Sequence, residues 1–516
     1  MLGNERGSTL LVVMLMILVF SILGLSILST SIGGAKRTEL REEQIQTDLE
    51  NIKSLNEAIA YIKEMIQREY KPEMTINQYK DLIKQITGNT FGYDILDLSE
   101  TDYKDEIIVD QDFTRVLKVT SGEYSQLIYI TGIPSFLKYA AGSRGTLTLN
   151  GSTYFEEGNI YAKDKLRVSK QAKYIFGEDK VKETYLSSVS GTSQSYIFIE
   201  NENEDERIDM CSSNCYENGL PIGNFHKVAV ENINLAFDPN APIFTKENTE
   251  YVGVDIERTF KEKLQVAGFI EKSSNPYQYS VKEIIEHARE SMSIKFIDSF
   301  LDIDDTNSNI KGYLYKAKDT DPVYIDTEEL RLNKNKWIVI DGDAIFENES
   351  SSNLKISANI LVNGNLTIRG DIAFDSTIYV LKNTTINNVN LTGLDGNELI
   401  LMSEGTLEIA RINKFKNDEE NKIKAYLYTS QEAVVYAMGS YLFVEGGLFA
   451  KGDLEINAYR GAATQGGADI TFEAKPNVEA SRLRIKNDKR LFLNQAQGLP
   501  RIDKLEVITD LMKKEK

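Results

Sequence analysis

A ten-residue pattern of hydrophobic and polar positions recurs along the chain. After one variable residue, three apolar residues are followed by a three-residue polar turn and then by an apolar–x–apolar triplet. The pattern is clearest in NILVNGNLTI (359–368), and it returns in WIVIDGDAIF (337–346), GLFAKGDLEI (447–456) and NIYAKDKLRV (159–168). Alternating apolar and polar residues are typical of a half-buried strand, and the glycine or aspartate at the turn centre tolerates a left-handed backbone. Each copy therefore predicts two short strands joined by a tight turn.

The spacing of the copies predicts how these strand pairs are arranged. Weaker copies at 377–386, 399–409 and 425–436 leave steps that cluster near 22 residues. A fixed period of this size indicates stacked supersecondary units. We therefore predict a mainly β protein whose body is a right-handed β-helix, or β-solenoid, with turns of about 22 residues. Independent hairpins in a β-sandwich are the alternative.

One outward-facing position of the repeat is apolar in every clear copy. If the neighbouring apolar residues point to the interior, alternation turns Tyr161, Val339, Leu361 and Phe449 outward. An apolar row on an outer face needs a cover, because a large exposed apolar patch is unusual in a monomer. We expect either the helix that contains Ile45–Ile66 or the central insertion to pack there.

The amino-terminal pattern is continuously apolar rather than alternating. No charged residue occurs from Ser8 to Ala35, and this stretch holds the roughly 20 apolar residues that a membrane-spanning helix needs. We predict a transmembrane helix over 9–35. Two other interpretations stay open: a cleaved secretory signal, for which Gly33 and Ala35 would suit the cleavage site, and a prepilin-like segment. The flanking basic residues do not fix the orientation.

A helical period continues beyond the apolar run. Apolar residues recur at steps of three and four through Ile45, Leu49, Ile52, Leu55, Ile59, Ile62 and Ile66. This stripe predicts an amphipathic helix over 36–71, ending before Pro72. It packs either on its own domain or against a partner helix in a coiled coil.

The remaining patterns complete the predicted organisation of the chain. We expect, in order, a short leader (1–8), the transmembrane helix (9–35), the amphipathic helix (36–71), a strand-rich cap (72–145), the first solenoid turns (146–177), a mixed α/β insertion (178–320), the main solenoid (321–475) and a carboxy-terminal strand and tail (476–516). The insertion includes SVKEIIEHARESM (280–292), in which Ser280 and Glu283 have the spacing of a capping box.

Composition narrows the functions that such a chain can have. The formal net charge is −19, so the surface repels phosphate backbones, and nucleic acid is not an expected partner. Only two histidines and two cysteines are present, which leaves little for histidine-based catalysis or a zinc site. Cys211 and Cys215, four positions apart in an exported chain, are a candidate disulfide. We expect no catalytic, cofactor-binding or metal-binding residues.

The amino terminus resembles that of PilX-type pilus-assembly proteins. The resemblance is carried by ERGSTLLVVMLMILVFSILGLSIL (5–28), in which Glu5-Arg6-Gly7 precedes a long aliphatic helix and Gly7–Ser8 is the candidate processing site. Major pilins carry a glutamate five residues after the processing glycine, and that position is Val12 here. The resemblance therefore favours a pilus-type membrane helix over a filament subunit.

Two longer stretches and the end of the chain extend this resemblance. Residues 133–168, 441–462 and 494–507 are similar to large membrane-anchored PilX-like proteins of Gram-positive bacilli. The resemblance implies a single-pass cell-membrane protein with the bulk of the chain outside the cell. It also implies a structural or adhesive role beside pilus-assembly or pilin-like proteins, with cell-wall glycan as a further candidate partner. A membrane-tethered glycan-active enzyme and a bactofilin-like envelope scaffold are the alternatives.

Overall fold

The computed structural model describes residues 8–71, 74, 76–90, 92–104, 107, 109, 113–131, 134–203, 206–217, 219–245, 253–271, 274–317, 321–348, 353–410, 420–466, 469–487, 498–500, 504–510 and 512–515. Strands make up 44% of the described residues, so the described part of the protein is mainly β, and a long apolar helix precedes the strands. The chain forms two compact units. Unit 1 contains residues 1–131 and 505–516, and unit 2 contains residues 132–504. The large unit is therefore inserted between two parts of the small one, whereas the sequence predicted divisions near 145 and 475.

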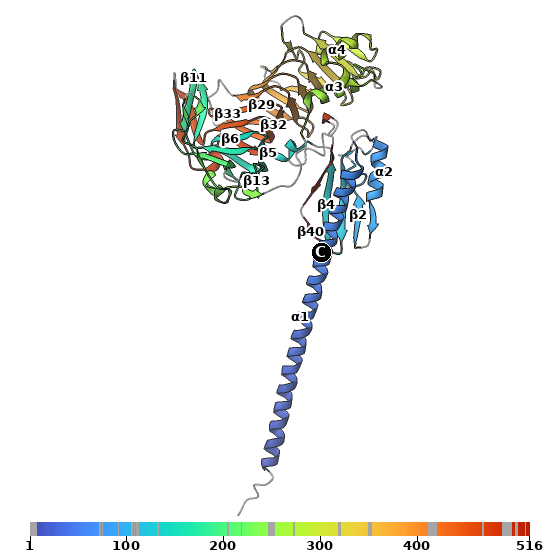
Figure 1. Ribbon diagram of the computed structural model, residues 1–516, viewed down its shortest axis with the longest axis vertical. Coiled ribbons are helices and arrows are strands. Elements are labelled where there is room, and N and C mark those ends of the chain that lie inside the picture. The colour runs from blue at the N-terminus through green and yellow to red at the C-terminus, as the bar shows by residue number, and fades with distance from the viewer. Residues whose placement is uncertain are drawn as a thin grey trace, which may run out of the picture. The chain divides into compact units, whose positions relative to one another are not determined.

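Unit 1 consists of a long helix and an antiparallel sheet. Figure 1 shows α1 (Ser8–Glu69) as one uninterrupted helix, and its 62 residues span about 93 Å at 1.5 Å per residue. The other elements are α2 (Ile76–Ile86), β1 (Gly88–Thr90), β2 (Tyr93–Asp97), β3 (Arg115–Ser121), β4 (Tyr124–Thr131), β39 (Glu506–Thr509) and β40 (Lys513–Lys514). The sheet order is β1-β2-β3-β4-β39, and β40 also pairs with β4. Of the strands within the predicted cap (72–145), β1 to β4 therefore belong to the sheet of unit 1.

Unit 2 contains three rows of strands joined by parallel pairs, which we call the strand stack. Row A consists of β19 (Ile294–Ile297), β20 (Gly312–Lys316), β23 (Trp337–Asp341), β26 (Asn359–Val362), β28 (Ser376–Val380), β30 (Leu399–Ser403), the second halves of β32 (Glu420–Thr429) and β34 (Tyr441–Ala450), β5 (Tyr139–Ser143), β8 (Asn159–Ala162), β13 (Tyr196–Ile199) and β18 (Ile243–Thr245). The four clear sequence copies each contribute one strand to this row, so the repeated pattern is also a structural repeat.

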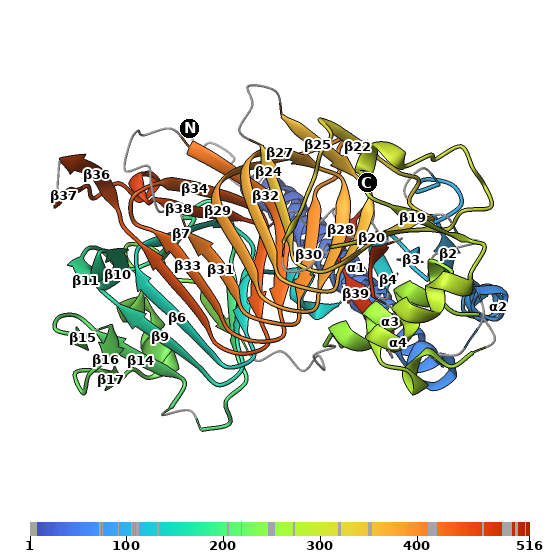
Figure 2. The same cartoon turned by 90° about the horizontal axis from the view of Figure 1, so that it is seen from above.

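Rows B and C complete the strand stack. Row B consists of β21 (Val323–Tyr324), β24 (Ala344–Asn348), the first halves of β27 (Leu366–Phe374) and β29 (Thr384–Gly393), β31 (Leu407–Ala410), β33 (Ala433–Ala437), β35 (Leu454–Ala458), β6 (Thr146–Gly151), β9 (Lys165–Ser169) and β14 (Ile208–Cys211). Row C consists of β22 (Glu329–Arg331), β25 (Leu354–Ser357), the second halves of β27 and β29, the first halves of β32 and β34, β38 (Leu483–Lys486), β7 (Thr153–Glu157) and β12 (Ser188–Val189). Figure 2 shows β29, β31, β33, β6 and β9 of row B alongside one another.

The order of the strands differs from the order of the chain at one place. From β19 to β34 row A follows the sequence, but the next strand is β5, where Leu448 is paired with Ala141. The chain therefore enters the stack in its middle, reaches one end at β18, crosses to the other end at β19 and winds back. We call one passage of the chain through rows A, B and C a rung. The first rung in the sequence (139–157) is paired with the last rung (441–486).

The interior of the stack is apolar because all three rows turn alternate side chains inward. Ile360 of row A, Ile368 of row B and Phe374 of row C are fully buried in one cluster. The polar turns of neighbouring rungs also pack closely against one another. A Cβ on Gly364 would lie 2.2 Å from the carbonyl oxygen of Gly342 in the neighbouring rung, so a glycine is needed there.

Segments outside the rows cover parts of the stack. They are the hairpins β10–β11 (Gln171–Phe176, Glu178–Glu183), β15–β16 (Tyr216–Glu217, Leu220–Pro221) and β36–β37 (Gly461–Gly466, Asp469–Ala474), the strand β17 (His226–Lys227), the helices α3 (Ile256–Val266) and α4 (Val281–His287), and short 3-10 turns. The capping box predicted for α4 is present, with Ser280 and Glu283 bonded reciprocally.

Candidate functional site

The first half of α1 is an apolar surface without a cover in unit 1. Large apolar side chains from Val12 to Ile32 are 44–69% exposed. Hydroxyl groups within this half donate to the helix backbone, as in Ser21 Oγ to Ile17 O (2.7 Å) and Thr30 Oγ1 to Ser26 O (2.8 Å). This arrangement suits a hydrocarbon environment, where each polar group needs an internal partner. Among the described residues, α1 is the one helix long and apolar enough to cross a membrane, although a signal sequence has the same properties.

The candidate processing site lies at the start of this helix. Gly7 is outside the described residues, and α1 begins at Ser8. Gly33 lies within the helix, with no other atoms near the position of a Cβ. The apolar run and the amphipathic stripe therefore form one rod.

The amphipathic stripe of α1 divides into an exposed and a buried part. Ile45 and Leu49 are 61% and 62% exposed, whereas Leu55 and Ile62 are fully buried. The buried residues share a core with Leu117 of β3 and with other residues of the sheet. From Leu55 onward, the stripe is apolar because it packs against the sheet of unit 1. This packing does not explain why Ile45 and Leu49 are apolar.

The carboxy-terminal segment returns to α1. Lys514 Nζ lies 2.9 Å from Asp48 Oδ2, and its ammonium group lowers the pKa of Asp48. The same ammonium lies over the ring of Tyr124, 5.0 Å from its centroid. These contacts place β40 beside the helix and the β4 edge of the sheet.

The four residues of the predicted outward row are buried in unit 2. Val339, Leu361 and Phe449 are at most 1% exposed, and Tyr161 is 2% exposed. They belong to a second apolar cluster, separate from the interior of the stack, that also contains Phe260, Leu264, Ile284 and Ile285 of α3 and α4. The central insertion therefore supplies the cover, while α1 packs in its own unit.

Aromatic stacking along this row explains one small residue. Gly142 is paired with both Phe449 and Tyr161, and the two rings stack with their centroids 5.7 Å apart. A Cβ on Gly142 would lie 2.4 Å from the ring of Phe449. The glycine therefore lets the two rings meet across the strand that separates them.

Lys263 of α3 lies beside the apolar cluster that contains the four outward-facing residues. Lys263 Nζ donates to Leu499 O (2.8 Å) and lies 5.6 Å from the ring centroid of Trp337. Burial lowers the pKa of Lys263 to about 8, against a smaller opposing effect of Glu262. Desolvation explains the direction, because a low dielectric disfavours the ammonium form.

We expect Lys263→Met to change how the stability of unit 2 depends on pH. Because the pKa is lower in the folded state, the unfolded state binds more protons between about pH 8 and 10.5, and the wild type gains stability as pH rises through that window. Relative to the wild type, the variant should therefore be most stable below pH 8. Its free energy of unfolding relative to that of the wild type should then fall by on the order of 1–3 kcal/mol as the pH rises to 10.5. Urea unfolding followed by the fluorescence of the single tryptophan measures this. A constant difference from pH 7 to 10.5 would contradict it.

Buried polar side chains hold the first rung of the stack against the last. Arg460 is 1% exposed and donates to Ser152 Oγ (2.6 Å), Leu186 O (2.6 Å) and Asp238 O (2.8 Å). Asn150 and Asn457 are fully buried, paired in register, and joined by a 3.0 Å bond from Asn150 Nδ2 to Asn457 Oδ1. Such buried polar groups require partners, so this pairing of distant segments is specific. No sequence pattern predicted this pairing, because Asn150 and Asn457 are 307 positions apart.

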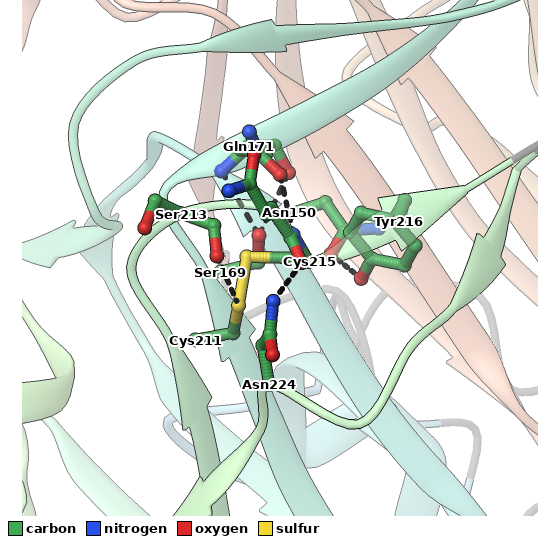
Figure 3. Close-up of a disulfide and its surroundings, with 9 residues drawn as sticks. Asn150, Ser169, Gln171, Cys211, Ser213, Cys215, Tyr216 and Asn224 are labelled. Atoms are coloured by element: carbon green, nitrogen blue, oxygen red, sulfur yellow. Dashed lines mark hydrogen bonds between the residues drawn. A yellow bond between two sulfur atoms is a disulfide. The ribbon is translucent and has the colours of Figure 1, made fainter.

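The two cysteines lie beside this junction. Figure 3 shows the disulfide between Cys211, at the end of β14, and Cys215. The Cα atoms of the two cysteines are 5.8 Å apart. The backbone N–H of Cys215 donates to Gln171 Oε1 (2.7 Å). The next residue, Tyr216, bonds through its hydroxyl to Asn150 Oδ1, so the cysteine loop is fastened to the outer side of row B.

Comparisons with known proteins place few limits on this chain. No protein-family model and no curated protein matches it. Among solved structures, the competence-associated pilin ComZ from Thermus thermophilus is similar at 12% identity, over 78% of this chain and 81% of that one. The TM-score of this match is 0.25.

Proposed function

We propose that this chain is a membrane-anchored, extracellular structural protein of a type IV pilus-like system, acting in assembly or adhesion. The observation that carries the proposal is α1: its first half is an exposed apolar rod, and its second half is packed into a folded unit. A rod of this kind is expected to anchor the chain in a membrane while holding the rest of it outside. The resemblance of residues 5–28 to PilX-type proteins supplies the pilus context.

We also propose that the strand stack is a right-handed β-solenoid that serves as a rigid display surface. Three rows of parallel pairs and one continuous apolar interior support this interpretation. Stacked rungs bury their apolar faces against each other, which gives a stiff body from short repeats.

The proposal treats Gly7–Ser8 as a processing site and the chain as a partner of pilins. Val12 occupies the position where major pilins carry glutamate, which favours an accessory protein over a filament subunit. The disulfide between Cys211 and Cys215 is compatible with an oxidising location outside the cell.

Crosslinking in the native envelope tests this function. The wild-type protein should co-purify with pilin-like proteins or with the membrane platform of the pilus machine. The matched variant Ile17→Lys/Phe20→Lys should lose these partners, because each lysine at the centre of a membrane costs about 2.5–3.5 kcal/mol. Absence of pilus components from the wild-type complex, or an identical set of partners with the variant, would refute the proposal.

A further inference from the structure

Beside the junction of the first and last rungs, three side chains have the arrangement of a reaction centre. They are Lys173 of the β10–β11 hairpin, and Glu455 and Asn457 of β35. Lys173 Nζ lies 2.7 Å from Glu455 Oε2, and Asn457 Nδ2 donates to Glu455 Oε1 at 2.8 Å. One carboxylate therefore contacts both an amine and the amide nitrogen of an asparagine.

The carbonyl oxygen of the same asparagine is held by two donors. Asn457 Oδ1 accepts from Asn150 Nδ2 (3.0 Å) and from the backbone N–H of Lys173 (3.0 Å). Two fixed donors on a carbonyl oxygen polarise it and stabilise the negative charge that develops when a nucleophile attacks its carbon. A primary amine, a carboxylate and a carboxamide whose oxygen accepts from two donors thus lie together.

Its surroundings restrict water and hold the groups in place. Asn457 and Asn150 are fully buried, and the side chains of Lys173 and Glu455 are 18% and 24% exposed. Lys173 Nζ also donates to Gly219 O (3.3 Å) and lies 5.2 Å from the ring centroid of Tyr216, which the neighbouring disulfide loop carries. Because the amine of Lys173 and the amide of Asn457 both contact the carboxylate of Glu455, a reaction between them would be intramolecular.

We propose that Lys173 and Asn457 form a side-chain amide crosslink with loss of ammonia. The Glu455 carboxylate takes a proton from the Lys173 ammonium, and the neutral amine attacks Cγ of Asn457. Glu455 returns the proton to Nδ2, the Cγ–Nδ2 bond breaks, and the remaining extra proton leaves with the ammonia. Ammonium and carboxamide thus give one secondary amide and one ammonium ion, with no oxidant or co-reactant, and Glu455 is regenerated.

The position of the crosslink gives it a mechanical role. It joins positions 284 residues apart, one on the hairpin that follows the first rung and the other on the last rung. Unit 1 is connected to the chain just before the first rung and just after the last. A covalent bond between these rungs keeps the stack closed when tension reaches it through its two connections.

Mass spectrometry of the full-length, reduced and denatured protein tests the crosslink. The intact mass should fall below the sequence mass by one ammonia, and proteolysis should give a branched peptide joining Lys173 to Asn457. On a denaturing gel the looped chain should migrate faster than the linear Lys173→Arg variant. A full sequence mass, or ammonia loss with Lys173 and Asn457 in separate linear peptides, would overturn the proposal, as would Asn457 recovered as aspartate.

Three variants separate the chemistry from folding. Glu455→Gln should retain the full mass because it has no carboxylate to transfer the proton, and Lys173→Arg should do so while keeping a positive charge beside Glu455. Lys165→Arg is the matched control, since Lys165 pairs with Asp209 (3.2 Å) on row B away from Asn457. This control should still lose ammonia. Because the wild-type mass is decisive by itself, a variant that fails to fold does not affect the test.

Discussion

Replacing Leu361 by aspartate is expected to release α3 and α4 from the strand stack. Leu361 is fully buried between Val339 and Tyr379 in row A, beneath the apolar side chains of the central insertion. A carboxylate at that position would have no compensating partner. We therefore expect the free energy of unfolding of unit 2 to fall by at least about 4 kcal/mol. The single tryptophan, Trp337, lies 2% exposed in the same cluster, and its fluorescence should shift to the red.

The matched control for this variant lies on another face of the same rung. Thr367 points outward from row B and is partly exposed, so Thr367→Asp should change the stability by no more than about 1 kcal/mol. Limited proteolysis should cut the segment 253–290 in Leu361→Asp and spare it in Thr367→Asp. Equal resistance in both variants would show that the insertion does not cover the outward row.

Replacing Ile62 by aspartate is expected to unfold unit 1 and leave the strand stack intact. Ile62 is fully buried in the core that joins α1 to the sheet, and a charge there should cost at least about 4 kcal/mol. Hydrogen exchange of the full-length protein in detergent measures the effect. Amide protection in β2, β3 and β4 should be lost, while rows A to C keep theirs.

Leu49→Asp provides the comparison within the same helix. Leu49 belongs to the same sequence stripe but is 62% exposed, so the substitution should leave protection in unit 1 nearly unchanged. If the two variants lose protection equally, the division of the stripe into an exposed and a buried part is incorrect.

The sequence predicted the local structure well because local structure depends on neighbouring residues. The phrase at 359–368 predicts two strands and a turn, and the structure pairs its strands with those of the copy at 337–346. Alternation also placed Leu361 and Phe449 on the outer face and required a cover for them. The sequence offered two segments as the cover, the helix that contains Ile45–Ile66 and the central insertion. In the structure, α3 and α4 of the central insertion pack against the outward-facing residues.

The long-range arrangement had no comparable signal. Ala141 pairs with Leu448, and β4 pairs with β39, across sequence distances at which no periodicity acts. Within the predicted cap (72–145), β3 and β4 form a sheet with the last strands of the chain, whereas β5 belongs to row A. Row A likewise begins at β19, within the segment that the sequence assigned to an insertion.

The proposed reaction centre was hidden for the same reason. Lys173, Glu455 and Asn457 are ordinary residues in separate parts of the sequence. Their chemistry becomes visible only when the first and last rungs pair and the β10–β11 hairpin folds over row B.

Amino-terminal sequencing of the protein isolated from its native membrane tests the central claim most directly. The claim is that the apolar half of α1 stays attached and anchors both units outside the cell. The account predicts a chain in the membrane fraction that starts at Ser8, or at Met1 where processing has not occurred. A mature protein that starts near Lys36 and is recovered free of the membrane would contradict it.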